Sequence, residues 1–263
     1  VNCNPQEFIA KAKANDFAGA VETITRNNPM GQTCGLICPD KFCMQACTRA
    51  GIDFPINIPR VQATILEKYR TAESAAHPKL PANGKKVAVI GAGPAGIAAT
   101  AELSRLGYRI TLFESFEKIG GALNLIPDKR LPFEVIAKDW SFIDDPDMIE
   151  LRLNTPVNNP AALLEQDFDG VIVATGEPEG INLGIDGEEH AVSYLDYLRH
   201  PEHYAARGNI AVIGGGAVAT DCALTAVNNG AENVEMFVRR RVSDMRVTGE
   251  ERKSLLDAGV DLT

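Results

Sequence analysis

The residues whose chemistry stands out first are six cysteines, and their distribution along the chain is uneven. Five lie in the first 47 residues, at Cys3, Cys34, Cys38, Cys43 and Cys47, and only Cys222 stands apart. The C-x3-C-x4-C-x3-C spacing lacks the C-x2-C pair of zinc ribbons and differs from the bacterial ferredoxin run. Because soft thiolates suit both iron–sulfur clusters and zinc, spacing alone leaves a cluster, zinc and free thiols open.

A second candidate site is a glycine-rich turn with the pattern G-x-G-x-x-G. Its residues are Gly91, Ala92, Gly93, Pro94, Ala95 and Gly96. In this pattern Gly91 permits the turn, Gly93 lets the backbone approach a pyrophosphate, and Gly96 lets helix and strand pack closely. The pyrophosphate would lie at a helix N-terminus, which favours anions.

Two further features accompany this first turn. Glu114 ends the next expected strand, where a carboxylate binds a ribose hydroxyl. The sequence Lys118-Ile119-Gly120-Gly121 suits a loop that passes close to a flavin's phosphate or ribose, although a simple turn explains it equally. Together these residues predict a dinucleotide site.

A related turn follows later in the chain. The residues Gly214, Gly215, Gly216, Ala217, Val218 and Ala219 fit G-x-G-x-x-A. The next expected strand ends at Val238 without an acidic residue and continues into Arg239, Arg240 and Arg241. Guanidinium groups bind a 2′-phosphate well, so the run predicts NADPH rather than NADH, with a solvated basic turn as the alternative. Cys222, on the helix after this turn, is expected to be a small core residue.

The elements that must position these residues follow from periodicity. Residues 5–27 predict helix with a break at Asn15-Asp16, residues 55–59 an extended segment, and residues 61–72 helix. Residues 77–84 read as a linker. Strands are expected at 87–90, 109–114, 149–153, 171–174 (followed by Thr175-Gly176) and 234–238, and a further strand begins at residue 210. A helix is expected after each glycine turn, the first ending at residue 106 and the second at residue 228. This alternation predicts an α/β fold with parallel, doubly wound sheets.

Three domains are therefore expected: a helical domain over 1–76 and two Rossmann-like domains over 85–206 and 207–263. The chain opens without methionine and stops where a further strand begins, so we expect a fragment whose last domain is truncated. The net charge of −9 argues against a nucleic-acid binder. No apolar run is long enough to span a bilayer, and we expect a cytoplasmic protein.

The motifs in their order resemble one known family. The stretch from Asn28 to Pro39 (NPMGQTCGLICP), then Cys43 and Cys47 and the sequence PINI at 55–58, resembles the iron–sulfur domain shared by the glutamate synthase small subunit and dihydropyrimidine dehydrogenase. GAGPAG, Glu114, the strand end Ala174-Thr175-Gly176 and GGGAVA with its arginines resemble the FAD and NADPH domains of that family. Residues 239–251 resemble selenate-reductase-type iron–sulfur subunits.

The resemblance implies the ligands of two [4Fe–4S] clusters. Cys3 corresponds to the last cysteine of an early run and would bind one cluster with Cys38, Cys43 and Gln62. Cys47 would serve the other cluster, and Cys34 is the less certain member. The first three cysteines of the early run are absent, and Asn4 replaces a usual proline.

The resemblance also implies a function: hydride passes from NADPH to FAD, and single electrons pass through the clusters to a partner subunit or domain. A flavin disulfide reductase is an alternative, but the loop 120–132 contains no redox cysteine. A non-catalytic scaffold whose cysteines bind zinc or nothing is another. The expected truncation predicts that the chain alone lacks NADPH-dependent turnover.

Overall fold

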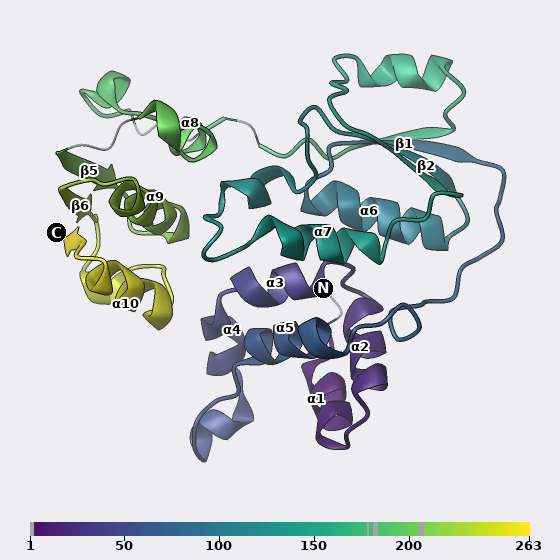
Figure 1. Ribbon diagram of the computed structural model, residues 1–263, viewed down its shortest axis with the longest axis horizontal. Coiled ribbons are helices and arrows are strands. Elements are labelled where there is room, and N and C mark those ends of the chain that lie inside the picture. Colours follow the sequence, from purple (N-terminus) through teal and green to yellow (C-terminus); the bar gives the residue numbers. More distant parts are fainter. Residues whose placement is uncertain (1–2, 178, 181–183, 205–207) are drawn as a thin grey trace. The chain divides into compact units, whose positions relative to one another are not determined.

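The computed structural model describes residues 3–177, 179–180, 184–204 and 208–263 (Figure 1). The chain forms two compact units, Val1–Leu123 with Asp128–Gly176 and Asn124–Pro127 with Glu177–Thr263. The first unit contains both the helical segment and the first sheet. The predicted boundary at 206/207 lies outside the described residues, and residues 184–204 belong to the second unit. The three predicted domain boundaries therefore remain predictions.

The N-terminal segment is helical, as predicted. Its α-helices are α1 Pro5–Lys13, α2 Phe17–Thr25, α3 Gly31–Ile37, α4 Asp40–Gln45 and α5 Ile58–Tyr69. Asn15 has a positive φ of 62°, and the Asp16 side chain accepts the Gly19 N–H at the start of α2, so the predicted break is confirmed. Phe8, Val21 and Leu66 are fully buried and form the centre of this segment.

The cysteine-rich stretch is two short helices rather than one. Cys38 ends α3 in an extended conformation, and Pro39 precedes α4. The expectation of an extended segment at residues 55–59 is wrong at its end, because the Asn57 side chain caps α5 and Pro59 fits its first turn. Gly35 lets α3 approach α5 closely, since a Cβ there would lie 2.8 Å from the Pro59 carbonyl oxygen.

The first sheet is parallel and has the strand order β3-β2-β1-β4. Its strands are β1 Lys86–Ile90, β2 Arg109–Phe113, β3 Ile149–Arg152 and β4 Gly170–Val173, and its helices are α6 Pro94–Arg105 and α7 Phe133–Ser141. Leu163 packs on one face with Ala88 and Ile90, whereas α6 approaches Val89 on the other. Because both faces are covered, the sheet is doubly wound, as predicted.

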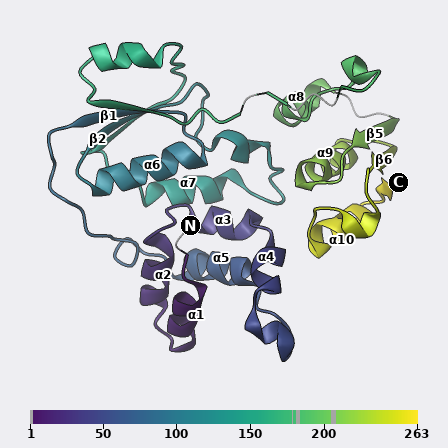
Figure 2. The same cartoon turned by 180° about the vertical axis from the view of Figure 1, so that it is seen from behind.

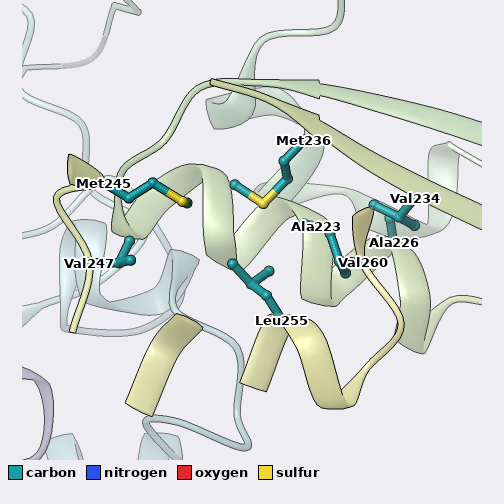
Figure 3. Close-up of a cluster of buried hydrophobic side chains, with 8 residues drawn as sticks. All are labelled: Ala223, Ala226, Val234, Met236, Met245, Val247, Leu255 and Val260. Atoms are coloured by element: carbon teal, nitrogen blue, oxygen red, sulfur yellow. The ribbon is translucent and has the colours of Figure 1, made fainter. Parts of the chain in front are cut away.

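The second unit repeats this pattern. It contains α8 Tyr194–Arg199, β5 Asn209–Ile213, α9 Ala217–Asn228, β6 Asn233–Phe237, α10 Gly249–Asp257 and β7 Asp261–Leu262. The strands are parallel in the order β5-β6-β7. Figure 3 shows its core, in which Met236 of β6 and Leu255 of α10 are fully buried beside Ala223 and Ala226 of α9. The predicted Rossmann-like fold is confirmed in both units.

A buried ion pair connects the helical segment to the first sheet. Arg70, which follows α5, contacts the carboxylate of Asp139 on α7, and neither side chain is exposed. The other Asp139 oxygen accepts the Thr33 backbone N–H of α3 at 2.8 Å. The Arg70 guanidinium lies 4.2 Å from the centre of the Phe142 ring. Asp139 therefore holds α3 and the end of α5 against α7, and both views show α3 beside α7 (Figures 1 and 2).

Candidate functional site

The two glycine turns share one backbone geometry. The Gly91 N–H donates to the Phe113 carbonyl at 2.7 Å, and the Gly214 N–H donates to the Phe237 carbonyl at 3.0 Å. Both glycines have positive φ, 100° and 143° respectively. Each turn therefore leads from the carboxyl end of a strand into the N-terminus of a helix, α6 or α9. Such helix N-termini are suited to a pyrophosphate.

The three glycines of the first turn are needed for different physical reasons. A Cβ on Gly91 would lie 2.5 Å from the Ala174 carbonyl oxygen, and one on Gly96 would lie 1.8 Å from the Gly91 carbonyl oxygen. A Cβ on Gly93 would approach the described chain no closer than the Gly121 Cα, at 3.8 Å. The chain itself explains Gly91 and Gly96. The described chain leaves room for a Cβ at Gly93, so a glycine there is explained by a ligand that approaches the backbone closely.

The loop containing Gly121 lies beside this turn. The Gly120 N–H donates to the Ala92 carbonyl at 2.8 Å, and a Cβ on Gly121 would lie 2.9 Å from the Gly93 Cα. Gly121 also has a φ of 54°. The glycines at 120–121 therefore serve a close approach to the first turn rather than an isolated reversal. Pro94 and Ala95, the first residues of α6, are exposed next to the turn.

Glu114 lies just after β2 and is only 5% exposed. One of its carboxylate oxygens accepts the Ala92 N–H at 2.8 Å, and the other accepts the Phe116 N–H at 3.0 Å. Glu114 therefore fixes the glycine turn in addition to any contact with a ribose. Thr175 and Gly176 follow β4 and are exposed, and the Thr175 Cα would lie 3.2 Å from a Cβ on Gly91. The structure thus brings these predicted residues together.

The second turn is open at Gly216, where an added Cβ would meet no described atom within 4 Å. Ala217 and Val218 begin α9, and Val218 is exposed. Arg239 and Arg240 follow β6, at the strand end where the sequence lacks an acidic residue, and both are exposed. The guanidinium groups are therefore accessible at the edge of the sheet that carries the glycine turn.

Arg246 lies beside the second turn and was missed by the sequence reasoning. The Arg246 backbone N–H donates to the Gly215 carbonyl at 3.2 Å, and Arg246 forms a parallel β-bridge with Gly216. In the first unit, the Gly120 backbone N–H donates to the Ala92 carbonyl in the corresponding way. The alternation of buried Met245 and Val247 around an exposed Arg246 was the available signal of an extended segment.

Cys3 contacts Gln62, and Cys38 and Cys43 lie near enough to Cys3 to affect its pKa. The Cys3 thiol lies 3.6 Å from the Gln62 side-chain oxygen, and the Gln62 amide donates to the Gly31 carbonyl at 2.7 Å. Burial raises the pKa of the Cys3 thiol, and the nearby thiols of Cys43 and Cys38 raise it further. The Cys3–Gln62 contact agrees with the ligand set that the resemblance implied, and the full set of Cys3, Cys38, Cys43 and Gln62 stays a prediction.

The other two N-terminal cysteines have different surroundings. Burial raises the pKa of the Cys34 thiol most, and the nearby Asp139 carboxylate and Cys38 thiol add to the effect. By contrast, the pKa of the Cys47 thiol is lowered, first by the backbone N–H of Ile56. Cys34 therefore adjoins the Cys3 group, whereas Cys47 lies among backbone donors that stabilise a thiolate.

This donor set fits an iron–sulfur cluster. Thiolates are its usual ligands, and cysteines at the corners of a cubic cluster lie farther apart than ligands that share one ion. Cys222 differs: it is 7% exposed, and burial raises its pKa to about 12. Its predicted place in a hydrophobic core is confirmed, and such a thiol is a poor ligand or nucleophile.

Comparisons with known proteins agree with this geometry. Residues 1–74 match the family described as dihydropyrimidine dehydrogenase domain II, 4Fe-4S cluster. Residues 89–141 match the NAD(P)-binding Rossmann-like domain, and residues 145–263 match the pyridine nucleotide-disulphide oxidoreductase family. The chain therefore combines a 4Fe-4S domain of the dihydropyrimidine dehydrogenase type with a pyridine nucleotide-disulphide oxidoreductase domain. The resemblance predicted from the motifs is confirmed at the level of these domains.

Two curated relatives illustrate the family. The chain is 33% identical over 270 residues to the NAD-dependent dihydropyrimidine dehydrogenase subunit PreT of Escherichia coli K12, covering 98% of this chain and 65% of PreT. It is 31% identical over 255 residues to the NADPH-Fe(3+) oxidoreductase subunit beta of Geobacter sulfurreducens, covering 90% of this chain and 37% of that subunit. The chain therefore spans just under two thirds of the length of PreT and little more than a third of the length of the Geobacter subunit.

A solved structure supports the fold. Histamine dehydrogenase from Rhizobium sp. 4-9 aligns over 98% of this chain and 38% of its own, with a TM-score of 0.58 and 20% identity. At that identity the likeness concerns the fold alone. Among the described residues, no helix combines the length and apolar character needed to cross a membrane.

Proposed function

We propose that the chain is the coenzyme-oxidising, electron-transferring part of a flavin and iron–sulfur oxidoreductase. NADPH would bind at Gly214, Gly216, Ala217 and Val218, with Arg239 and Arg240 on its 2′-phosphate. FAD would bind at Gly91, Gly93, Pro94, Ala95, Gly96, Glu114, Gly121, Thr175 and Gly176. A [4Fe–4S] cluster would bind at Cys3, Cys38, Cys43 and Gln62, with Cys34 adjacent and Cys47 on a second cluster.

One observation carries this proposal: the chain has a group of thiols with Gln62 ahead of two glycine turns of matching geometry. When bound, FAD accepts a hydride and releases electrons singly, and a cluster conducts single electrons. The residues of this chain bind and orient those groups. Gly93 leaves room for a pyrophosphate, Glu114 fixes the turn, and Gln62 supplies an oxygen ligand beside the thiols.

The names of two relatives bear on the choice between NADH and NADPH. PreT is named NAD-dependent, whereas the Geobacter subunit is named for NADPH. The arginines after β6 favour NADPH here, and Arg246 adds a cation beside the same turn. We further propose three domains, at 1–76, 85–206 and 207–263, a cytoplasmic location, and a separate subunit or domain as electron acceptor.

The flavin assignment is tested with Gly93→Val. Its branched side chain would occupy the space open to the pyrophosphate, so the variant should fold but lose FAD, measured as flavin per chain after anaerobic reconstitution with FAD, iron and sulfide. Gly170→Val is the matched control, because a Cβ at Gly170 in β4 meets no atom within 4 Å. The control should retain flavin. A folded Gly93→Val protein with the normal flavin content would disprove the site.

A further inference from the structure

Two imidazoles and a carboxylate lie together on a short turn of the second unit. One Glu202 oxygen lies 3.7 Å from His200 Nδ1 and 3.7 Å from His203 Nε2. One ligand atom from each of the three residues lies within 4.8 Å of the others. The two rings are stacked, with centroids 4.9 Å apart and planes 15° apart. Three metal-binding atoms therefore converge within four successive residues.

The backbone of this turn is held by local contacts. His200 caps the end of α8, and its carbonyl accepts the His203 N–H at 2.9 Å. Pro201 restricts the backbone between the ligands. The Tyr204 hydroxyl donates to the Asp196 carboxylate on α8. Because the backbone is ordered beforehand, a ligand that binds here loses less conformational entropy on binding.

We propose that His200, Glu202 and His203 form a zinc site. Two imidazole nitrogens and one carboxylate oxygen are the ligand set of open zinc sites, which keep a water in the fourth position. Donor atoms 3.7 Å apart can each reach one ion at about 2.0–2.2 Å after small side-chain movements. All three residues are exposed, so water has access to the remaining position. Calcium and magnesium prefer oxygen ligands, and the imidazoles favour zinc over them.

A bound ion would have a structural consequence for the second unit. It would connect the end of α8 to the turn that follows. Tyr197 of α8 packs against the core that includes Ala223 and Ala226 of α9, the helix of the second glycine turn. Zinc that binds only the folded turn stabilises it by mass action, and α8 with it. The site is separate from the proposed cluster and coenzyme residues and does not depend on them.

Nitrogen NMR of the imidazole rings tests the site directly, because the chain contains only four histidines. Zinc sulfate is added to protein labelled with 15N at about pH 7.5, where free imidazole is uncharged. We expect the ring nitrogens of His200 and His203 to shift together, with a dissociation constant in the micromolar range or below. Zinc bound by the cysteines leaves these ring signals unchanged, so the thiols do not confuse the result.

Variants give the test its controls. His203→Gln and Glu202→Gln should each weaken the zinc-dependent shift of His200 at least about tenfold. His190→Gln should leave it unchanged; His190 is an exposed histidine 3.5 Å from one carboxylate, Glu189, and is not in the three-residue group. If the His200 and His203 rings do not shift with millimolar zinc, or shift equally in Glu202→Gln, the proposal is wrong.

Discussion

Asp139→Ala should strongly destabilise the first unit. The Asp139 carboxylate is fully buried and has two partners on different elements, the Arg70 guanidinium and the Thr33 N–H. Within the described chain, Arg70 Nε and Nη1 have no hydrogen-bond partner, so the guanidinium relies on Asp139. Alanine would leave a buried cation without a counter-ion and a backbone donor without an acceptor.

The size of the loss follows from the burial. Removing one member of a buried ion pair costs about 3–5 kcal/mol of the free energy of unfolding, a large part of the typical 5–15 kcal/mol. At about 2 kcal/mol per molar urea, the unfolding midpoint would fall by roughly 1.5–2.5 M. The double variant Arg70→Met/Asp139→Leu should recover most of the loss, because both charges are removed.

Urea unfolding followed by circular dichroism measures this effect. Asp167→Asn is the control: Asp167 also pairs with a cation, Lys86, but it is 83% exposed and its loss should leave the midpoint unchanged. Hydrogen exchange provides a local measure, since the Thr33 amide should exchange faster in Asp139→Ala. If Asp139→Ala and Asp167→Asn shift the midpoint equally, or if the double variant is as unstable as the single one, the reasoning about the buried pair is refuted.

Four further predictions concern the coenzyme arginines, the cysteines and the packing of α3 against α5. Replacing Arg239 and Arg240 with glutamines should weaken NADPH at least about tenfold more than NADH in fluorescence titrations, because only NADPH carries the 2′-phosphate; equal losses, or the same result with Lys253→Gln on α10, would remove the arginines from coenzyme selection. In reduced, cluster-free protein, iodoacetamide should modify Cys47 before Cys3, since one pKa is lowered and the other raised. Burial raises the pKa of Cys222 to about 12, so little thiolate forms and Cys222 should remain unmodified in mass spectra; early labelling of Cys222 would contradict its burial. Gly35→Ala should lower the urea midpoint because its Cβ would meet the backbone of α5, and an unchanged midpoint would show that α3 and α5 can separate at no cost.

The sequence was most informative where local rules operate. Gly91 and Gly214 lie in the positive-φ turns that their motifs predict, and both strands before them are present. The break before α2 was predictable because Asn15 tolerates positive φ and Asp16 caps a helix. These features depend on residues within a few positions of one another, so one sequence is enough to find them.

Features that depend on distant residues could not be predicted in this way. Arg70 and Asp139 are 69 residues apart, and nothing in either neighbourhood specifies the other. The position of Arg246 beside Gly216 results from the chain returning to the turn after β6. Likewise, the sequence does not reveal that burial raises the pKa of the Cys34 thiol, whereas backbone N–H donors lower the pKa of the Cys47 thiol. Such pairings come from tertiary packing and need the structure.

The central claim is that Cys3, Cys38 and Cys43 hold an iron–sulfur cluster. Analysis of iron and sulfide after anaerobic reconstitution tests this claim most directly. Three proteins are compared: the unchanged chain, Cys38→Ala and the control Cys222→Ala, whose cysteine is a core residue. We predict that the unchanged chain and Cys222→Ala bind iron and sulfide with the broad visible absorbance of a cluster, and that Cys38→Ala loses most of all three. Equal iron and sulfide in Cys38→Ala and the unchanged chain would contradict the account.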